Sequence, residues 1–223
     1  MELAQLAVFV RPPVAGSVKT RLAEALGPRD ALRLYEAFVE DTISLCQRVQ
    51  SAGRVEVALW SAGPESETVH GWAERLGTSV SQQPAGGLGV KLEAAFDQGL
   101  RRFERVVVIG SDLPTLPLEL VVAAFDALED ASMSIGPAND GGSYAIGAAR
   151  GQTPRFAGVR WSTADACRDT LRANAGREVG ILPPWYDVDA PDDLALLRAH
   201  LSTNPSAAPA TASRLAELDA SHK

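Results

Sequence analysis

The sequence predicts a single α/β domain in which helices cover both faces of a mostly parallel central sheet. Short apolar runs rich in β-branched residues alternate along the chain with longer segments of helical periodicity, as in proteins of that class. The strongest run, at residues 106 to 109, carries no charge, which is typical of a parallel strand buried on both faces. With 223 residues, 46% of them hydrophobic, the chain is long enough to bury one complete core.

In the first half of the chain, a short buried strand is predicted at residues 6 to 10, directly before a loop rich in Pro and Gly. Apolar residues at helical spacing over residues 28 to 51 predict a long helix, and Pro28 suits its first turn. The elements that follow are a strand at 55 to 60, a helix near 66 to 76, a weaker strand at 78 to 82, a helix from about 88 to 102 and the strand at 106 to 109.

In the second half, Pro117 opens a helix with one apolar face. The later elements are strands at 133 to 136, at 143 to 147 and around 179 to 182, and helices near 164 to 174 and 191 to 201. We assign residues 1 to 201 to the domain. Residues 202 to 213 are rich in Ala, Pro, Ser and Thr, and only a short helical segment at 215 to 218 follows. Residues 202 to 223 are therefore predicted to form a mobile C-terminal tail.

Composition excludes several classes of function. A net charge of −7 argues against nucleic acid as a partner and favours a small-molecule ligand. No apolar stretch approaches the roughly 20 residues needed to cross a bilayer, and no secretory signal is evident. Two cysteines are too few for a disulfide framework or a zinc site. We expect a cytoplasmic protein that does not act at a membrane; the sequence carries no signal for an oligomeric state.

The loop RPPVAGSVKTRL, at residues 11 to 22, joins the first strand to a helix and carries fixed cations. Backbone N–H groups at a helix start, together with Lys and Arg side chains, suit a polyphosphate. Pro13 and Val18 stand where a Walker A loop needs glycine, so a phosphate grip here has a different design. The alternative is an exposed turn whose cations only keep it soluble. The candidate nucleotide-binding residues of this loop are Arg11, Pro13, Gly16, Lys19 and Arg21.

The strand at 106 to 109 ends in Gly110-Ser111-Asp112, followed by Pro114. In open α/β sheets, ligands bind at the carboxyl ends of the strands. A carboxylate beside a polyphosphate needs a divalent cation between them, and Mg²⁺ takes one or two carboxylates plus phosphate oxygens. Asp112 is therefore a candidate metal ligand, and Gly110 and Ser111 are candidate nucleotide contacts. The alternative is that Asp112 or Ser111 caps the next helix.

Four acids lie between residues 187 and 193, just before a predicted helix. Asp192 and Asp193 fit a helix N-terminus, where negative charge is favourable. Asp187 and Asp189 alternate on an extended segment and point to the same side. One of these two would supply the second metal carboxylate.

Three further segments offer contacts, each with an alternative. The glycines of Asn139-Asp140-Gly141-Gly142 fit a tight turn between strands, and Asp140 either belongs to that turn or binds an acceptor hydroxyl as a base. Gln83 and Gly86 either contact a nucleobase or acceptor, or belong to an ordinary strand-to-helix loop. Trp161 and Ser162 either border an acceptor pocket or, for the tryptophan, pack in the core.

Five segments, PPVAGSVKTRL, GSDLP, NDGGSYAIG, VRWST and YDVDAPDDL, occur in this order in one family. Over about residues 4 to 200, the chain resembles the DUF2064 family of GT-A-like transferases, within the nucleotide-diphospho-sugar transferase superfamily. It is distantly similar to the phospholactate and molybdenum-cofactor guanylyltransferases. The resemblance implies a single-domain Rossmann-like GT-A fold with a nucleotide and Mg²⁺ (or Mn²⁺) over the first loop. It also implies phosphate contacts from Lys19 and Arg21, and metal ligation by Asp112 and Asp189, with Asp187 as competitor.

The chain departs from the family pattern at three positions. Arg11 stands where lysine is common, and Asn139 stands where an acid is common. Gly87 replaces the usual aspartate before the third helix, so an acceptor or base contact from that position is lost.

Two enzymatic hypotheses and one binding hypothesis follow from these features. The favoured one is nucleotidylyl transfer from a nucleoside triphosphate to a small phosphorylated acceptor, because Lys19 and Arg21 suit the stabilisation of a leaving pyrophosphate. The alternative is a glycosyltransferase that uses a nucleotide-sugar, with Asp140 as the base. The third is a non-catalytic nucleotide-binding module. The candidate catalytic residues are Lys19, Arg21 and Asp140.

Overall fold

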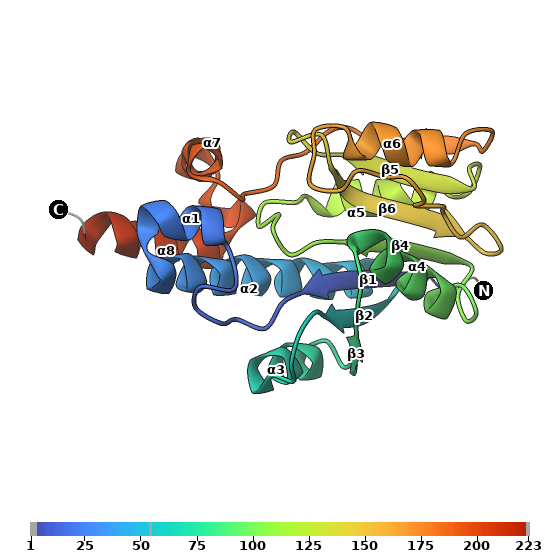
Figure 1. The fold of residues 1–223 in the computed structure, drawn as a ribbon. Coiled ribbons are helices and arrows are strands. Elements are labelled where there is room, and N and C mark those ends of the chain that lie inside the picture. Colours follow the sequence, from blue (N-terminus) through green and yellow to red (C-terminus); the bar gives the residue numbers. More distant parts are fainter. Residues whose placement is uncertain (1–3, 54, 222–223) are drawn as a thin grey trace.

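The structure is a computed structural model that describes residues 4–53 and 55–221. These residues form a seven-stranded open sheet in the order β3-β2-β1-β4-β6-β5-β7, with helices on both faces (Figure 1). Strand β6 runs antiparallel to β4 and β5, whereas all other neighbouring strands are parallel. The predicted fold class is confirmed.

The strands lie close to their predicted positions. They are β1 (Ala4–Val10), β2 (Val55–Ser61), β3 (Val80–Gln82), β4 (Arg105–Ile109), β5 (Met133–Pro137), β6 (Ser143–Ala149) and β7 (Val179–Ile181). Because β1 to β4 are parallel, their carboxyl ends meet at one edge of the sheet. Strand β6 runs the opposite way and therefore begins at that same edge. The loops that carry the candidate site residues are thus brought together.

The helices connect these strands. They are α1 (Thr20–Leu26), α2 (Pro28–Ala52), α3 (Glu67–Arg75), α4 (Leu88–Gly99), α5 (Leu118–Asp126), α6 (Ala166–Ala173), α7 (Pro191–Thr203) and α8 (Pro209–Ser221). Pro28 occupies the first turn of α2, as predicted. Within the described residues, no helix combines the length and the apolar character needed to cross a bilayer.

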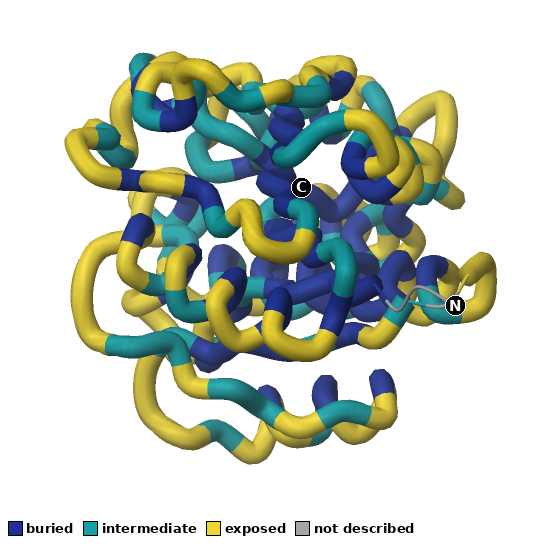
Figure 2. The backbone as a smooth tube through the Cα atoms, turned by 90° about the vertical axis from the view of Figure 1, so that its right-hand side faces the viewer, coloured by how far each residue is buried: buried dark blue, intermediate teal, exposed yellow. Residues whose placement is uncertain are grey.

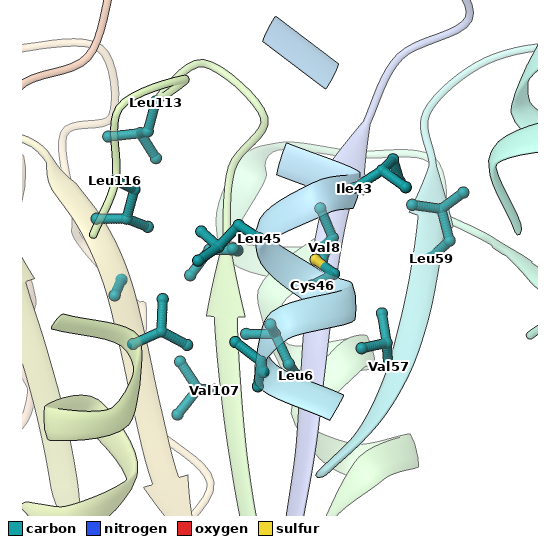
Figure 3. Close-up of a cluster of buried hydrophobic side chains, with 14 of the residues drawn as sticks. Leu6, Val8, Ile43, Leu45, Cys46, Val57, Leu59, Val107, Leu113 and Leu116 are labelled. Carbon is teal, nitrogen blue, oxygen red and sulfur yellow. The ribbon is translucent and has the colours of Figure 1, made fainter. Parts of the chain in front are cut away.

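The core has two layers, one on each face of the sheet, which Figure 2 shows as the dark blue interior. On one face, Leu6 and Val8 of β1 pack against Ile43 and Cys46 of the long helix α2 (Figure 3). Helices α3 and α5 extend this layer. On the opposite face, Ala7 belongs to a second cluster, formed with α4, α6 and neighbouring strands. Successive residues of β1 thus serve opposite layers, as the two-residue period of a strand requires.

The C-terminal segment differs from its prediction as a mobile tail. Helix α8 packs along α2, and Leu215 and Leu218 are buried in a third cluster shared with α1 and α7. The Asp41 carboxylate of α2 accepts the backbone N–H groups of Ala210 (3.0 Å) and Thr211 (2.9 Å). The Ala/Pro/Ser/Thr composition suggested a solvated tail, but two leucines three residues apart suffice to bury one helix face. Residues 222 and 223 of that prediction, and residues 1–3 and 54 of the predicted domain, lie outside the described residues.

Candidate functional site

A cavity of about 1070 Å³ lies at the edge of the sheet where β1, β2 and β4 end and β6 begins. Many of the predicted site residues line it. These are Arg11, Lys19, Arg21, Gln83, Gly86, Gly110, Ser111, Asp112, Asp140 and Asp189. Pro13, Gly16 and Asp187 are not among the lining residues. Gly16 instead shapes the loop, since its φ of 79° falls in the left-handed region that favours glycine.

Lys19 lies at the centre of this site, and other residues of the protein hold its ammonium group. Its Nζ atom lies 2.6 Å from Oδ1 of Asp112 and 2.6 Å from Oδ1 of Asp189, and it donates to the Val188 carbonyl at 2.7 Å. The side chain is only 3% exposed. An ammonium group has three donors, so all of them are engaged. Lys19 therefore holds the two candidate metal carboxylates and has no donor left for a phosphate in this arrangement.

The charge of Lys19 is stable. Burial lowers the pKa of its ammonium, but the carboxylates of Asp112 and Asp189 raise it by more, so the pKa lies above the ordinary value of 10.5. Lys19 also has a left-handed backbone (φ 49°, ψ 44°) as the residue that precedes α1. That conformation is uncommon for a residue with a side chain, and it is a feature of functional loops. The three contacts of Nζ compensate for it.

The segment that carries Asp189 is joined to the end of β4. The Val188 N–H group donates to the Asp112 carbonyl at 3.0 Å, which brings the two chain segments side by side. Asp193, at the start of α7, accepts the N–H groups of Asp189 (2.9 Å) and Ala190 (2.7 Å). Asp193 thus has the helix-start role predicted for it.

The acidic residues of the site suit a divalent cation. Burial raises the pKa of Asp187 to about 6, and the nearby Asp140 and Asp189 carboxylates add to this effect. The carboxylates of Asp140, Asp187 and Asp189 therefore lie close enough to influence one another. Asp112 and Asp189 lie close together, because both contact the Lys19 ammonium, and Mg²⁺ or Mn²⁺ commonly binds one or two carboxylates plus phosphate oxygens and water. Among the described residues no group of three or more acidic, His or Cys side chains is placed to hold a metal, so phosphates and water would complete the set.

Three other cations line the cavity. In the described part of the chain, Arg11, Arg21 and Lys91 have no ion-pair partner, unlike Lys19. Lys91 is in the first turn of α4 and was not predicted. Gln98 lies two helical turns further along, on the same face, and bonds to Ser81 of β3, so Lys91 faces the β3 side of the cavity. Its position just after the Gly86-Gly87 pair is the sequence feature that could have identified Lys91 as a site residue.

Tyr35 of α2 fixes the first loop. Its Oη atom accepts the Arg11 N–H group at 2.8 Å, donates to the Arg11 carbonyl at 3.0 Å and lies 3.5 Å from Oγ of Ser111. The ends of β1 and β4 are thereby held next to each other. Burial raises the pKa of Tyr35, so it stays a neutral donor and acceptor.

The loop after β3 is tied to the end of β2. Gln83 donates its backbone N–H to the Ser61 carbonyl (2.9 Å) and its Nε2 to the Trp60 carbonyl (3.0 Å). Gln83 and Gly86 therefore line the cavity on the same side as Lys91. Because its N–H and Nε2 groups are engaged, Gln83 can offer its carbonyl oxygens to a nucleobase.

The turn between β5 and β6 lies on the other side of β4. Asp140 lines the cavity there and accepts the Gly142 N–H group at 2.7 Å through Oδ1. Gly141 has a φ of 88°, and a Cβ on it would lie 2.2 Å from the Ala164 carbonyl oxygen. The predicted tight turn is confirmed, and it packs directly against the segment that follows Trp161.

Comparison with known proteins gives a family and a fold. Residues 45–163 match the family model described as "Uncharacterized protein conserved in bacteria (DUF2064)". A proposed nucleotide-diphospho-sugar transferase of Desulfovibrio desulfuricans G20 is 31% identical and has a TM-score of 0.87, with 99% of this chain and 96% of that chain covered. A sequence comparison with curated proteins gives no match.

More distant structures share the fold alone. CMP:2-keto-3-deoxy-manno-octonic acid synthetase, complexed with CTP, has a TM-score of 0.56 at 10% identity, covering 90% of this chain and 99% of that one. Rv0371c of Mycobacterium tuberculosis H37Rv, in a manganese complex, has a TM-score of 0.52 at 17% identity, covering 88% of this chain and 98% of that one.

Proposed function

The chain belongs to the bacterial family DUF2064, and from this premise we propose that it is a glycosyltransferase that uses a nucleoside-diphosphate sugar and a divalent cation. One observation carries the proposal: Asp112 and Asp189 converge in a cavity that three unpaired cations also line. That combination suits a diphosphate with its metal ion. The description of the Desulfovibrio relative, a nucleotide-diphospho-sugar transferase, supports a transferase that binds such a nucleotide.

The donor would lie over the first loop. Arg11, Arg21 and Lys91 would bind the phosphate oxygens, and the loop with Gln83 would contact the base. Asp112 and Asp189 would hold Mg²⁺ or Mn²⁺, which neutralises phosphate charge when bound. The manganese complex of the Mycobacterium protein, which shares the fold, is consistent with this assignment.

Asp140 would act as the base for the acceptor hydroxyl. Its Oδ1 atom is held by the Gly142 N–H group, which leaves Oδ2 to take a proton. The acceptor oxygen forms a bond to the anomeric carbon, and the bond from that carbon to the phosphate oxygen breaks. The electron pair leaves with the nucleoside diphosphate, and the hydroxyl proton passes to Asp140.

Nucleotidylyl transfer to a small phosphorylated acceptor is the second candidate. Three unpaired cations favour it, since they would also suit a triphosphate. Two observations weigh against it. Lys19, which the sequence suggested for the leaving pyrophosphate, is engaged by carboxylates, and Asp140 would repel an acceptor that is already an anion.

Product identity separates the two reactions. The purified protein is first screened by calorimetry for binding of nucleoside triphosphates and nucleotide-sugars with Mg²⁺ or Mn²⁺. A bound nucleotide-sugar is then incubated with pooled acceptors, and release of nucleoside diphosphate is expected. Pyrophosphate release from a triphosphate would favour the second candidate, and binding of neither ligand would overturn the proposal.

Variants link the activity to the site. Lys91→Ala is expected to weaken nucleotide-sugar binding about ten-fold, because a charge-assisted contact contributes about 1.5–3 kcal/mol. Binding of the bare nucleoside should not change. Asp112→Asn should abolish turnover, whereas Asp192→Asn, the same substitution at an exposed position outside the cavity, should not.

A further inference from the structure

We propose that the far end of the cavity, lined by Asp140, Ser143 and residues 161–164, is a subsite for an uncharged acceptor with a hydroxylated ring, such as a sugar or cyclic polyol. The ring would stack on Trp161, and its hydroxyls would bind Asp140. This inference rests on the proposed function, because the donor fills the other end of the same cavity. The cavity volume of about 1070 Å³ exceeds what one ligand usually occupies, so two substrates fit together.

The distribution of charge separates the two ends. Arg11 directly follows β1 and Lys91 faces the β3 side, so these two cations lie on the donor side of β4, and Arg21 is in the first turn of α1, directly after the loop that follows β1. On the other side, the described lining residues include one carboxylate, Asp140, and no cation. A phosphorylated or carboxylated acceptor would meet repulsion there, whereas a hydroxyl group would meet an acceptor oxygen.

Arg160, which directly precedes Trp161, is engaged elsewhere. Arg160 does not line the cavity, and its guanidinium donates to both carboxylate oxygens of Asp169, at 2.8 Å and 3.0 Å. It also pairs with Asp165 at 2.9 Å. Its charge is therefore balanced by two carboxylates, and it is not free to recognise an anion.

Trp161 has the geometry of a stacking surface. Its ring is half-buried, lines the cavity and packs against Phe156 with the ring centres 5.7 Å apart. Phe156 in turn stacks on Phe96 of α4. Gly89 leaves room for this layer, since a Cβ there would lie 3.3 Å from Nε1 of Trp161 and 3.1 Å from Cβ of Phe156. An aromatic ring that is supported from behind can stack on the apolar face of a sugar ring.

The backbone after Trp161 is held in an unusual conformation. Ser162 has a φ of 59°, which is uncommon for a residue with a side chain. Thr163 secures the turn, because its Oγ1 donates to the Arg160 carbonyl at 2.7 Å and accepts the Asp165 N–H group at 3.3 Å. Such conformations persist at ligand sites when the surroundings enforce them. Residues 162–164 of this turn line the cavity next to the turn that carries Asp140.

Matched ligand pairs test the charge preference. Glucose with glucose 6-phosphate, and ribose with ribose 5-phosphate, are titrated by saturation-transfer NMR while a saturating nucleoside diphosphate and Mg²⁺ block the donor end. The neutral member of at least one pair is expected to bind ten-fold more tightly than its phosphorylated counterpart. Tighter binding of the phosphorylated members, or no binding of either neutral ring, would overturn the inference.

Variants test the residues. Trp161→Ala should weaken binding of the neutral ring about ten-fold, Trp161→Phe should retain most of it, and nucleotide affinity should stay the same in both. Ala164→Arg places a cation in the cavity wall and should shift preference towards the phosphorylated member. Ala157→Arg, at an exposed position outside the cavity, should not. Unchanged ligand preference in both Trp161→Ala and Ala164→Arg would place the acceptor elsewhere.

A failure of the proposed function and a failure of the acceptor assignment give different results. If no nucleoside diphosphate binds the wild-type protein, the proposed function fails, and the same titrations are made on the protein alone. If a nucleotide-sugar binds but the neutral rings do not, the proposed function stands and only the acceptor assignment falls.

Discussion

At the scale of single residues, Lys19 sets the charge balance of the site. The sequence offers it as a phosphate ligand, because it follows a Gly/Pro loop at a helix start. In the fold its ammonium lies between two carboxylates that are far from it along the chain, Asp112 and Asp189. No local pattern reports such a long-range pairing. In the proposed function, the other cations of the cavity, Arg11, Arg21 and Lys91, would bind the phosphates.

Replacing Lys19 by Met should lower the free energy of unfolding by about 2 kcal/mol, because two carboxylates are left facing each other without their cation. The value is reduced from that of a fully buried pair, since the Asp112 and Asp189 side chains are 42% exposed. Urea denaturation measures it. Lys91→Met, which removes an unpaired ammonium, is the control and should change stability little.

The pH dependence of that difference follows from the raised pKa of Lys19. A raised pKa means that the ammonium contributes its full stability below the ordinary value of 10.5 and loses it as the pH rises through the higher folded value. The gap between wild type and Lys19→Met should therefore be constant from pH 7 to pH 9 and narrow only above pH 10.5. A gap that already closes at pH 8 would contradict the described pairing.

At the scale of elements, the sequence predicted which residues lie at the ends of strands, but it did not predict which side of a helix faces the cavity. Arg11 directly follows β1 and Asp112 lies three residues after β4, and parallel strands bring such positions to one edge. The direction in which Lys91 faces depends instead on the rotation of α4 about its axis relative to β3. Packing with residues distant in sequence decides that rotation. The turn that contains Asp140 was predictable for a different reason. Gly141 has a φ of 88°, in the left-handed region that favours glycine.

The segment that carries Trp161 is held by α6. Asp169 of that helix accepts two bonds from the Arg160 guanidinium and lies 3.3 Å from the Arg160 backbone nitrogen. These bonds lower the pKa of Asp169 to about 2. Helix α6 thus helps to position one wall of the cavity through Asp169.

Arg160→Ala should lower the melting temperature at pH 7 and much less at pH 2. A depressed carboxyl pKa stabilises the fold above the unfolded value of 3.8, and this contribution disappears as the pH falls through about 2. Calorimetric melting at pH 7, 4 and 2 follows the difference. Arg168→Ala, which removes an exposed pair with Asp165 within one helix turn, should have the smaller effect at pH 7. Equal losses at pH 7 and pH 2 would show that the Arg160–Asp169 pair is not responsible.

At the scale of the whole molecule, α8 completes the domain. It covers a face that α1, α2 and α7 present together, with Ala208, Leu215 and Leu218 buried. Composition alone could not predict this, because the apolar face that receives α8 is assembled from three helices in different parts of the chain.

Deleting residues 208–223 should lower the melting temperature by about 10 °C. Two buried leucines contribute about 1.5–3 kcal/mol each, and 1 kcal/mol corresponds to about 2–4 °C for a chain of this size. The double variant Leu215→Ala/Leu218→Ala should reproduce most of the loss in differential scanning calorimetry. Leu196→Ala, on the exposed side of α7, is the matched control. An unchanged melting temperature in the deletion would mean that α8 does not pack on the domain in solution.

Because β6 runs antiparallel to β4, the turn that joins β5 to β6 lies at the cavity edge of the sheet, and the segment before α6 packs against that turn. The far wall of the cavity therefore comes from two nearby segments, around residues 140–146 and 161–164, whereas the basic side chains and Asp112 come from earlier parts of the chain. If the proposed function holds, related proteins can change these two segments, by point changes or by altered loop length, without changing the nucleotide site. The antiparallel strand would then let the specificity for the second substrate evolve independently of that for the first.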